Sequence, residues 1–297
     1  MSTIRPTTLW KTRQVLLSSR PLSWVNTAYP FAAAYIVTTG HVDALLVVGT
    51  LFFLIPYNLL MYGINDVFDY ESDLRNPRKG GVEGAMLDPS LHRTVLLSGI
   101  VTAVPVLGLM LVLAGTAHPL SWVVLAVSLF AVAAYSVPGL RFKERPVVDS
   151  VTSSTHFVSP AVYGLVVAGA AGTPGLVALL AAFFLWGMAS HAFGAVQDVV
   201  PDREGGIASI ATALGAARTV RLAIGCWAAA GLLMLATGWP GFLGAVLAVP
   251  YIAAAWPFRS VSDARAETAN AGWKRFLWLN FFTGFLVTML LIVWVLL

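Results

Sequence analysis

Nine long apolar runs dominate this sequence and restrict the folds that it can adopt. They cover residues 22–39, 43–63, 94–115, 119–137, 151–171, 175–197, 218–237, 240–257 and 276–296. An α-helix needs about 20 apolar residues to cross the hydrocarbon core of a bilayer, and these runs are close to that length. Transmembrane β-strands are about 10 residues long and alternate in hydrophobicity, so uniform runs do not predict a barrel. We therefore predict an all-α integral membrane bundle of nine transmembrane helices.

The composition supports a membrane protein. Only 11% of the residues are charged and 58% are hydrophobic, whereas soluble domains carry about 25% charged residues. This composition excludes a soluble globular enzyme, a disordered chain and a nucleic-acid-binding module, so we expect membrane lipid and no nucleic acid as a partner. The first run follows basic residues as in a secretory signal, but it is too long and lacks a small-residue cleavage pattern, so we expect a retained helix. No soluble domain interrupts the runs, which predicts one membrane domain over residues 1–297.

The placement of basic residues predicts the topology. The short connections 39–42, 115–118, 169–174 and 238–240 contain none of the 18 Lys and Arg residues. Cytoplasmic loops are enriched in Lys and Arg, so the N-terminus and the other loops are expected in the cytoplasm and the C-terminus outside. Of the 14 acidic residues, only Asp43 is expected near the outer face. The active-site cavity is therefore expected to open at the cytoplasmic side.

A first acidic cluster follows the second run. Asn65, Asp69 and Asp73 are spaced at i, i+4 and i+8. If the helix continues, each step of four residues turns only about 40°, so the three side chains form one stripe. Mg²⁺ commonly binds one or two carboxylates together with substrate phosphates and water, which suits such a sparse set of oxygens. The alternative is a solvated loop whose acids only keep the helix end in water.

A second acidic cluster ends the sixth run. Asp198 and Asp202 are again four residues apart, although Pro201 can interrupt a helix between them. Carboxylates beside a low-dielectric interior are costly unless cations pair with them. Two clusters at equivalent depths favour one shared site in which Mg²⁺ ions hold a diphosphate.

Basic and aromatic residues accompany the two clusters on the same side. Tyr135 can donate a hydrogen bond to a leaving diphosphate, while Arg141 and Lys143 can bind phosphate oxygens. Orientation by positive charge explains any one of these basic residues equally well. His191 lies within an apolar run, where a lone histidine is more often packed and hydrogen-bonded than catalytic. Trp186 can line an apolar cavity and stabilise a carbocation through a cation–π contact.

At these residues the chain resembles the UbiA family of intramembrane prenyltransferases. Asn65, Asp69 and Asp73 match the first family motif, the pair Asp198 and Asp202 matches the second, and residues 135–143 resemble the Tyr/Lys loop. Within the family, the stretches 18–31, 55–85, 135–146, 183–199 and 274–280 resemble the bacterial lycopene elongases. The chain departs from the broader family at Gly80–Glu83, where Arg-Pro is common, and at Gly206–Ser209, where a basic residue often follows the second motif.

This resemblance implies a Mg²⁺-dependent enzyme of carotenoid biosynthesis in a bacterial cell membrane. The implied donor is an allylic diphosphate, dimethylallyl diphosphate, and the implied lipophilic acceptor is lycopene. The implied metal ligands are Asn65, Asp69, Asp73, Asp198 and Asp202, of which the four carboxylates are catalytic together with Tyr135. The implied diphosphate contacts are Arg78, Lys79, Arg141 and Lys143. One alternative is the same reaction on a quinone or porphyrin precursor. A secondary transporter is a remote alternative, because transport sites tend to lie near the bilayer midplane.

Overall fold

The computed structural model describes residues 7–74 and 86–297. Every regular element in these residues is helical and none is a strand, which confirms the all-α prediction for the described part of the chain. The chain divides into two compact units, one holding Met1–Arg141 and Ser159–Ala170, the other Phe142–Val158 and Ala171–Leu297. Helix α8 (Val148–Val167) contributes residues to both units.

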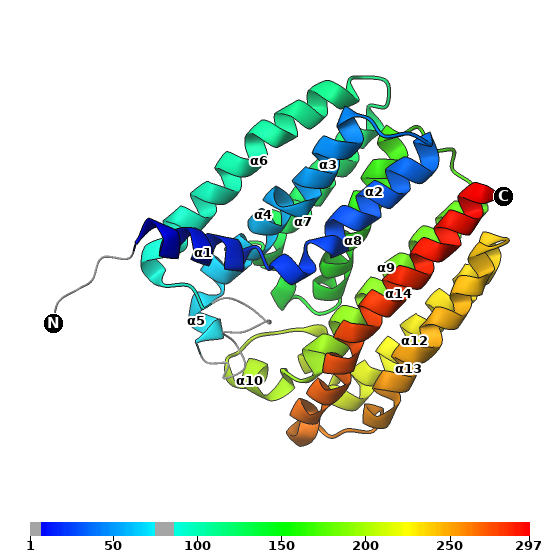
Figure 1. The fold of residues 1–297 in the computed structure, drawn as a ribbon. Helices are drawn as coiled ribbons and strands as arrows, with labels where there is room; N and C mark the ends of the chain where they lie inside the picture. Colours follow the sequence, from blue (N-terminus) through cyan, green and yellow to red (C-terminus); the bar gives the residue numbers. More distant parts are fainter. Residues whose placement is uncertain (1–6, 75–85) are drawn as a thin grey trace. The chain divides into compact units, whose positions relative to one another are not determined.

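In the first unit, the helices pack against one another in pairs. Besides the second part of α8, they are α1 (Thr8–Ser18), α2 (Val25–Thr39), α3 (Ala44–Leu54), α4 (Pro56–Phe68), α5 (Tyr70–Asp73), α6 (His92–Ala114) and α7 (Leu120–Ser136). Helix α2 packs against α3, both α3 and α4 pack against α6, and α4 also packs against α7 (Figure 1). Gly40 ends α2 in the left-handed conformation that glycine favours, and the Asp43 carboxylate caps α3 by accepting from the Leu46 N–H at 2.8 Å.

The second predicted run, residues 43–63, is not one straight helix. Pro56 lacks an N–H and its ring clashes with the carbonyl four residues earlier, so α3 ends at Leu54 and α4 begins at Pro56. At this break the Asn58 Nδ2 group donates to the Phe53 and Leu54 carbonyls at 2.8 and 3.0 Å. Thr27 Oγ1 also donates to the Phe53 carbonyl at 2.7 Å. Because an unsatisfied backbone group in hydrocarbon costs several kcal/mol, these two side chains stabilise the break within a span.

Replacing Asn58 by Leu should therefore destabilise the protein. The side chain is fully buried, and its loss removes the Asn58 donor from two buried carbonyls at an expected cost of about 1–3 kcal/mol. The measurement is the free energy of unfolding in detergent, with Asn26→Leu on the exposed face of α2 as the control. Equal stabilities of the two variants would contradict this account of the break.

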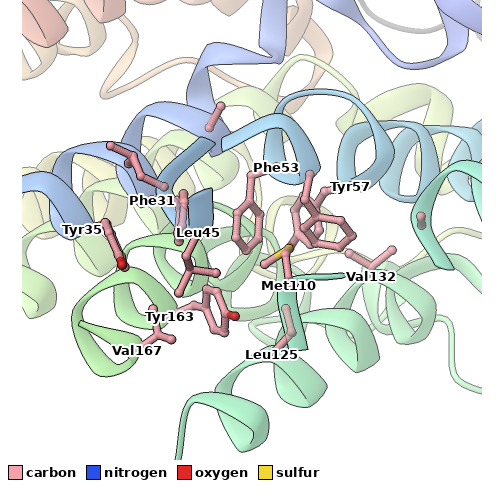
Figure 2. Packing of buried hydrophobic residues seen from close by; sticks show 14 of the residues in the cluster. Phe31, Tyr35, Leu45, Phe53, Tyr57, Met110, Leu125, Val132, Tyr163 and Val167 are labelled. Carbon is pink, nitrogen blue, oxygen red and sulfur yellow. The ribbon is translucent and has the colours of Figure 1, made fainter. Parts of the chain in front are cut away.

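The core of the first unit contains a group of packed aromatic rings (Figure 2). The ring centroids of Phe31 and Phe53 are 5.2 Å apart, as are those of Phe53 and Tyr57. Tyr163 of α8 stacks on Phe31 at 5.8 Å. A Cβ at Gly49 would overlap the Phe31 ring, so only glycine lets α3 approach α2 this closely. These contacts position α4, whose far end carries the first acidic motif.

The second unit packs its helices around another aromatic cluster. Besides the first part of α8, they are α9 (Pro174–Val196), α10 (Val199–Glu204), α11 (Ile210–Leu214), α12 (Ala216–Met234), α13 (Ala248–Ala255) and α14 (Asn270–Leu296). Helix α12 packs against α9 and α13, and α13 packs against α14 (Figure 1). Trp227 is 1% exposed and stacks on Tyr251 with the ring centroids 5.7 Å apart. These contacts hold α9, whose end leads into the second acidic motif.

Six helical stretches in the described residues are long and apolar enough to cross a membrane. They are Ala44–Phe68, Pro89–Ala114, Pro174–Val196, Ala216–Thr237, Gly241–Phe258 and Asp263–Leu296. They overlap six of the predicted runs, although the last begins 13 residues before the predicted 276–296 run, and the remaining three runs fall on α2, α7 and α8. The 240–257 run is also less regular than predicted, because its first part (Gly241–Leu247) is a 3₁₀-helix. The chain is therefore a multi-pass integral membrane protein.

Candidate active site

The first acidic motif lies on helical backbone, as its spacing predicts. The Asp69 N–H donates to the Asn65 carbonyl at 2.9 Å, and the Asp73 N–H donates to the Asp69 carbonyl at 2.8 Å. Helix α4 ends at Phe68 and α5 begins at Tyr70, so Asp69 occupies the single residue between them. Apart from Asp69, the residues from Asn65 to Asp73 are thus helical. The three polar side chains therefore follow one another at successive turns.

The end of α7 lies beside this motif. Ser136 is 1% exposed, and its Oγ donates to Asn65 Oδ1 at 2.9 Å. Tyr135, the residue before it, is half-buried near the end of α7. The hydrogen bond fixes the orientation of the Asn65 amide and brings the Tyr135 segment to the same end of the first unit as the acidic motif.

One predicted phosphate-binding residue also reaches this end. Arg141 Nη2 is 3.9 Å from Asp69 Oδ1, and the Asp69 side chain is only 4% exposed. Arg141 has a φ of 40°, a left-handed conformation that is uncommon and strained for a residue other than glycine. Lys143 follows in a 3₁₀ turn (Phe142–Glu144) that belongs to the second unit. Arg78 and Lys79 lie outside the described residues.

A buried ion pair beside the motif was not predicted from the sequence. Arg20 Nη2 is 2.9 Å from Asp66 Oδ1, and the exposed fractions of the two side chains are 19% and 0%. The Arg20 guanidinium also lies 4.3 Å from the centroid of the Tyr62 ring. Burial alone would lower the pKa of Arg20, but Asp66, Tyr62 and Asp73 together outweigh it, so the pKa of Arg20 lies above its ordinary value. Asp66 is therefore held by an arginine and is distinct from the stripe of Asn65, Asp69 and Asp73.

The second acidic motif has a similar local structure in the other unit. Asp198 lies between the end of α9 and the start of α10, and the Asp202 N–H donates to its carbonyl at 2.9 Å. Pro201 falls in the first turn of α10, where a missing N–H does not remove an intrahelical hydrogen bond. Helical spacing between the two carboxylates is thus compatible with the proline. Both aspartates are half-buried.

The loops around the second motif are anchored by charge-assisted hydrogen bonds. Arg203 Nη1 donates to Asp263 Oδ2 at 2.6 Å, and Arg203 Nη2 donates to the Thr212 carbonyl at 2.8 Å. Asp263 Oδ1 accepts from the Ala216 N–H at the start of α12 at 2.7 Å. Arg203 therefore fixes the connection that follows Asp202.

The donor atoms of each motif suit a hard divalent cation. Among the described residues, no three acidic, histidine or cysteine side chains gather closely enough to hold a metal ion by themselves. The first motif offers two carboxylates and one amide, and the second offers two carboxylates. An ion bound at either motif would therefore complete its coordination with water or substrate oxygens, which Mg²⁺ commonly does. The motifs, which offer only oxygen atoms, therefore fit Mg²⁺ if water or substrate oxygens supply its remaining ligands.

Sequence comparison identifies relatives over nearly the whole chain. Residues 27–285 match the model of the UbiA prenyltransferase family. A C(50) β-cyclic carotenoids biosynthesis protein of Dietzia sp. is 55% identical over 97% of this chain, and the chain covers 66% of that protein, just under two thirds of its length. A lycopene elongase/hydratase of Corynebacterium glutamicum is 50% identical over 95% of this chain and 97% of its own length.

Solved structures share the fold at low sequence identity. A UbiA homolog from Archaeoglobus fulgidus, bound to DMAPP and Mg²⁺, has a TM-score of 0.64 at 17% identity, covering 91% of this chain and 98% of its own. A digeranylgeranylglyceryl phosphate synthase structure also has a TM-score of 0.64, at 12% identity, covering 96% of this chain and 98% of its own. These similarities establish the fold of the chain.

Proposed function

This chain belongs to the UbiA family and is a membrane prenyltransferase, and we propose that it adds dimethylallyl groups to lycopene in carotenoid biosynthesis. The names of its Dietzia and Corynebacterium relatives support a carotenoid acceptor. The Archaeoglobus homolog was solved with DMAPP and Mg²⁺, which supports an allylic diphosphate donor and a divalent metal. The proposed enzyme is thus of the lycopene elongase type.

The observation that carries this proposal is the shared local structure of the two acidic motifs. In each motif an aspartate, Asp69 or Asp198, lies where a long helix gives way to a short one. A second aspartate follows one turn later in both. We propose that these carboxylates and the Asn65 amide bind Mg²⁺ and, through it, a diphosphate.

The basic residues and the tyrosine would bind the rest of the diphosphate. Arg141 already lies beside Asp69, so its guanidinium can contact a diphosphate held at the first motif. Tyr135 can donate a hydrogen bond to an oxygen of the leaving group, and Lys143, Arg78 and Lys79 complete the proposed set. When bound, Mg²⁺ supplies Lewis-acid stabilisation of the negative charge that develops on the diphosphate.

The apolar spans would protect the reactive carbon. Departure of the diphosphate breaks the allylic C–O bond and leaves a carbocation, which water would quench. A terminal double bond of lycopene attacks this cation and forms the new C–C bond, leaving a tertiary cation on the acceptor. Loss of a proton or capture of water completes the reaction. Arg141 and the other cationic residues, together with the Tyr135 hydroxyl, favour the first step because they stabilise the charge that develops on the leaving group.

We also propose nine membrane spans in one domain over residues 1–297. Within the first unit, Arg20, Arg141 and the end of α4 meet at one end, and the connection between α2 and α3 contains no Lys or Arg. This distribution supports a cytoplasmic N-terminus, an external C-terminus and a site that opens to the cytoplasm of a bacterial cell.

Product analysis tests the proposed reaction. We expect the protein in lipid nanodiscs, given lycopene, dimethylallyl diphosphate and Mg²⁺, to release diphosphate and to raise the mass of lycopene by one or more five-carbon units. Excess chelator should abolish both changes, and omission of the donor is the control. Unchanged lycopene alongside a prenylated quinone or porphyrin precursor would favour the alternative acceptor. Absence of diphosphate release with every acceptor would contradict prenyl transfer.

A further inference from the structure

A buried polar network in the second unit is not used by the diphosphate site. Ser150 Oγ on α8 is 3.0 Å from His191 Nδ1 on α9. The neighbouring Asp149 is fully buried, and its two carboxylate oxygens accept from the N–H groups of Ser150 and Ile210, both at 2.7 Å. These hydrogen bonds fix the Asp149 carboxylate, which is close enough to His191 to interact with its charge. The histidine is thus held by a hydroxyl and faces a fixed negative charge.

His191 lies on α9, close in sequence to the second acidic motif. It precedes Val196, the last residue of α9, by five residues, which corresponds to about 7.5 Å along a helix axis. Asp198 follows two residues beyond that end. His191 is half-buried. The imidazole therefore belongs to the candidate span Pro174–Val196, whereas the carboxylate proposed to hold the metal comes just after it.

The position of His191 within a candidate membrane span indicates a functional role. An ionisable side chain within a membrane span is costly, and its retention points to a functional role. The nearby Ser154 satisfies its hydrogen-bonding capacity by donating to the Phe184 carbonyl at 2.7 Å, as a purely structural serine does. Ser150 instead pairs with a side chain that can carry a proton, and Asp149 stabilises that side chain when it becomes positively charged.

We propose that His191 accepts the proton that ends prenyl transfer, an inference that rests on the proposed function. In the elimination route, the C–H bond next to the tertiary cation breaks, its electron pair forms the new C=C bond, and the proton binds His191 Nε2. In the hydration route, a water oxygen forms the C–O bond with the cation and passes one proton to the same nitrogen. Both routes use the tautomer in which His191 Nδ1–H donates to Ser150 Oγ.

The ratio of prenylated carotenoid to released diphosphate tests this proposal. In His191→Gln, diphosphate release should continue while carotenoid product per diphosphate falls about 100-fold, a typical loss for a missing general base. Without the base, the tertiary cation should revert by breaking the new C–C bond, which regenerates lycopene, and water should then capture the dimethylallyl cation as dimethylallyl alcohol. Ser150→Ala keeps the imidazole but loses its hydrogen-bond partner, so it should lower the ratio less. The matched control is His156→Gln, which removes the buried histidine of α8 and should keep the wild-type ratio.

A folded His191→Gln protein with the wild-type ratio would overturn the proposal. If His191→Gln does not fold, the Ser150→Ala variant tests the proposal instead, and a wild-type ratio in that variant would overturn the proposal. An equal loss in His156→Gln would mean that any buried histidine has this effect, which likewise contradicts a specific role. The wild-type protein distinguishes failure of this proposal from failure of the proposed function. If the proposed function is wrong, the wild-type protein releases no diphosphate in the presence of lycopene.

Discussion

Asp69→Asn and Asp198→Asn proteins should each release diphosphate from dimethylallyl diphosphate at least about 10³ times more slowly than the wild type. Losing a carboxylate ligand weakens the charge stabilisation of the leaving group by several kcal/mol, and each 1.36 kcal/mol changes the rate about tenfold. Asparagine keeps the volume of the side chain, so the buried Asp69 position should stay packed. The measurement is the initial rate of diphosphate release at saturating Mg²⁺ and donor.

The chain offers a matched control for each of these variants. Glu71 lies on α5 beside Asp69 and Asp73, and Glu204 lies on α10 two residues after Asp202, and both glutamates are exposed. Two residues along a helix correspond to a turn of about 200°, so neither glutamate shares the face of its neighbouring aspartate. Glu71→Gln and Glu204→Gln remove the same charge and should retain nearly full activity. Equal losses in the glutamine variants would show that only net negative charge matters.

Arg20→Met should produce the largest loss of stability. The substitution leaves the Asp66 carboxylate, whose side chain is 0% exposed, without the guanidinium 2.9 Å away. Removing one partner of a buried ion pair typically costs about 3–5 kcal/mol. The raised pKa of Arg20 means that the guanidinium stays charged throughout the neutral pH range, so titration of the arginine should add no pH dependence to the loss there. Unfolding in mixed detergent micelles measures it.

A double variant separates the ion pair from the packing of its side chains. Arg20→Met combined with Asp66→Asn removes both charges, so it should be more stable than Arg20→Met alone. Arg13→Met, on the exposed surface of α1, is the control for loss of an arginine and should have little effect. If Arg20→Met is as stable as Arg13→Met, the ion pair does not stabilise this end of the first unit.

The helices could be predicted because apolar runs of membrane length are long and distinct. The break before Pro56 could not be placed in the same way, because residues 43–63 are apolar on both sides of it. What permits the break is a tertiary contact: Thr27 of α2 reaches the Phe53 carbonyl, 26 residues further along the chain. A single sequence does not reveal such a partner. Helical periodicity does predict the stripe of Asn65, Asp69 and Asp73, because it depends on local geometry alone.

The sequence alone could predict only in part the different roles of the neighbouring aspartates Asp66 and Asp69. Asp66 and Asp69 lie three residues apart and are chemically identical, yet Asp66 pairs with Arg20 and Asp69 lies near Arg141. Both arginines adopt left-handed backbone conformations, which their sequence does not predict. In the sequence, Arg20 is one of several basic residues before the first run and could be interpreted as an orienting charge. Its contact with Asp66, 46 residues away, assigns it a place beside the acidic motif.

The most direct test of the two-motif site is to locate the metal. Mn²⁺ can replace Mg²⁺ at an oxygen site and gives an anomalous X-ray signal. Crystals grown with Mn²⁺ and an unreactive thio analogue of dimethylallyl diphosphate should show metal density in contact with Asp69 and with Asp198, and the diphosphate bound to that metal. Metal density at only one motif, or a diphosphate bound away from both, would contradict the proposal that the two motifs form one site.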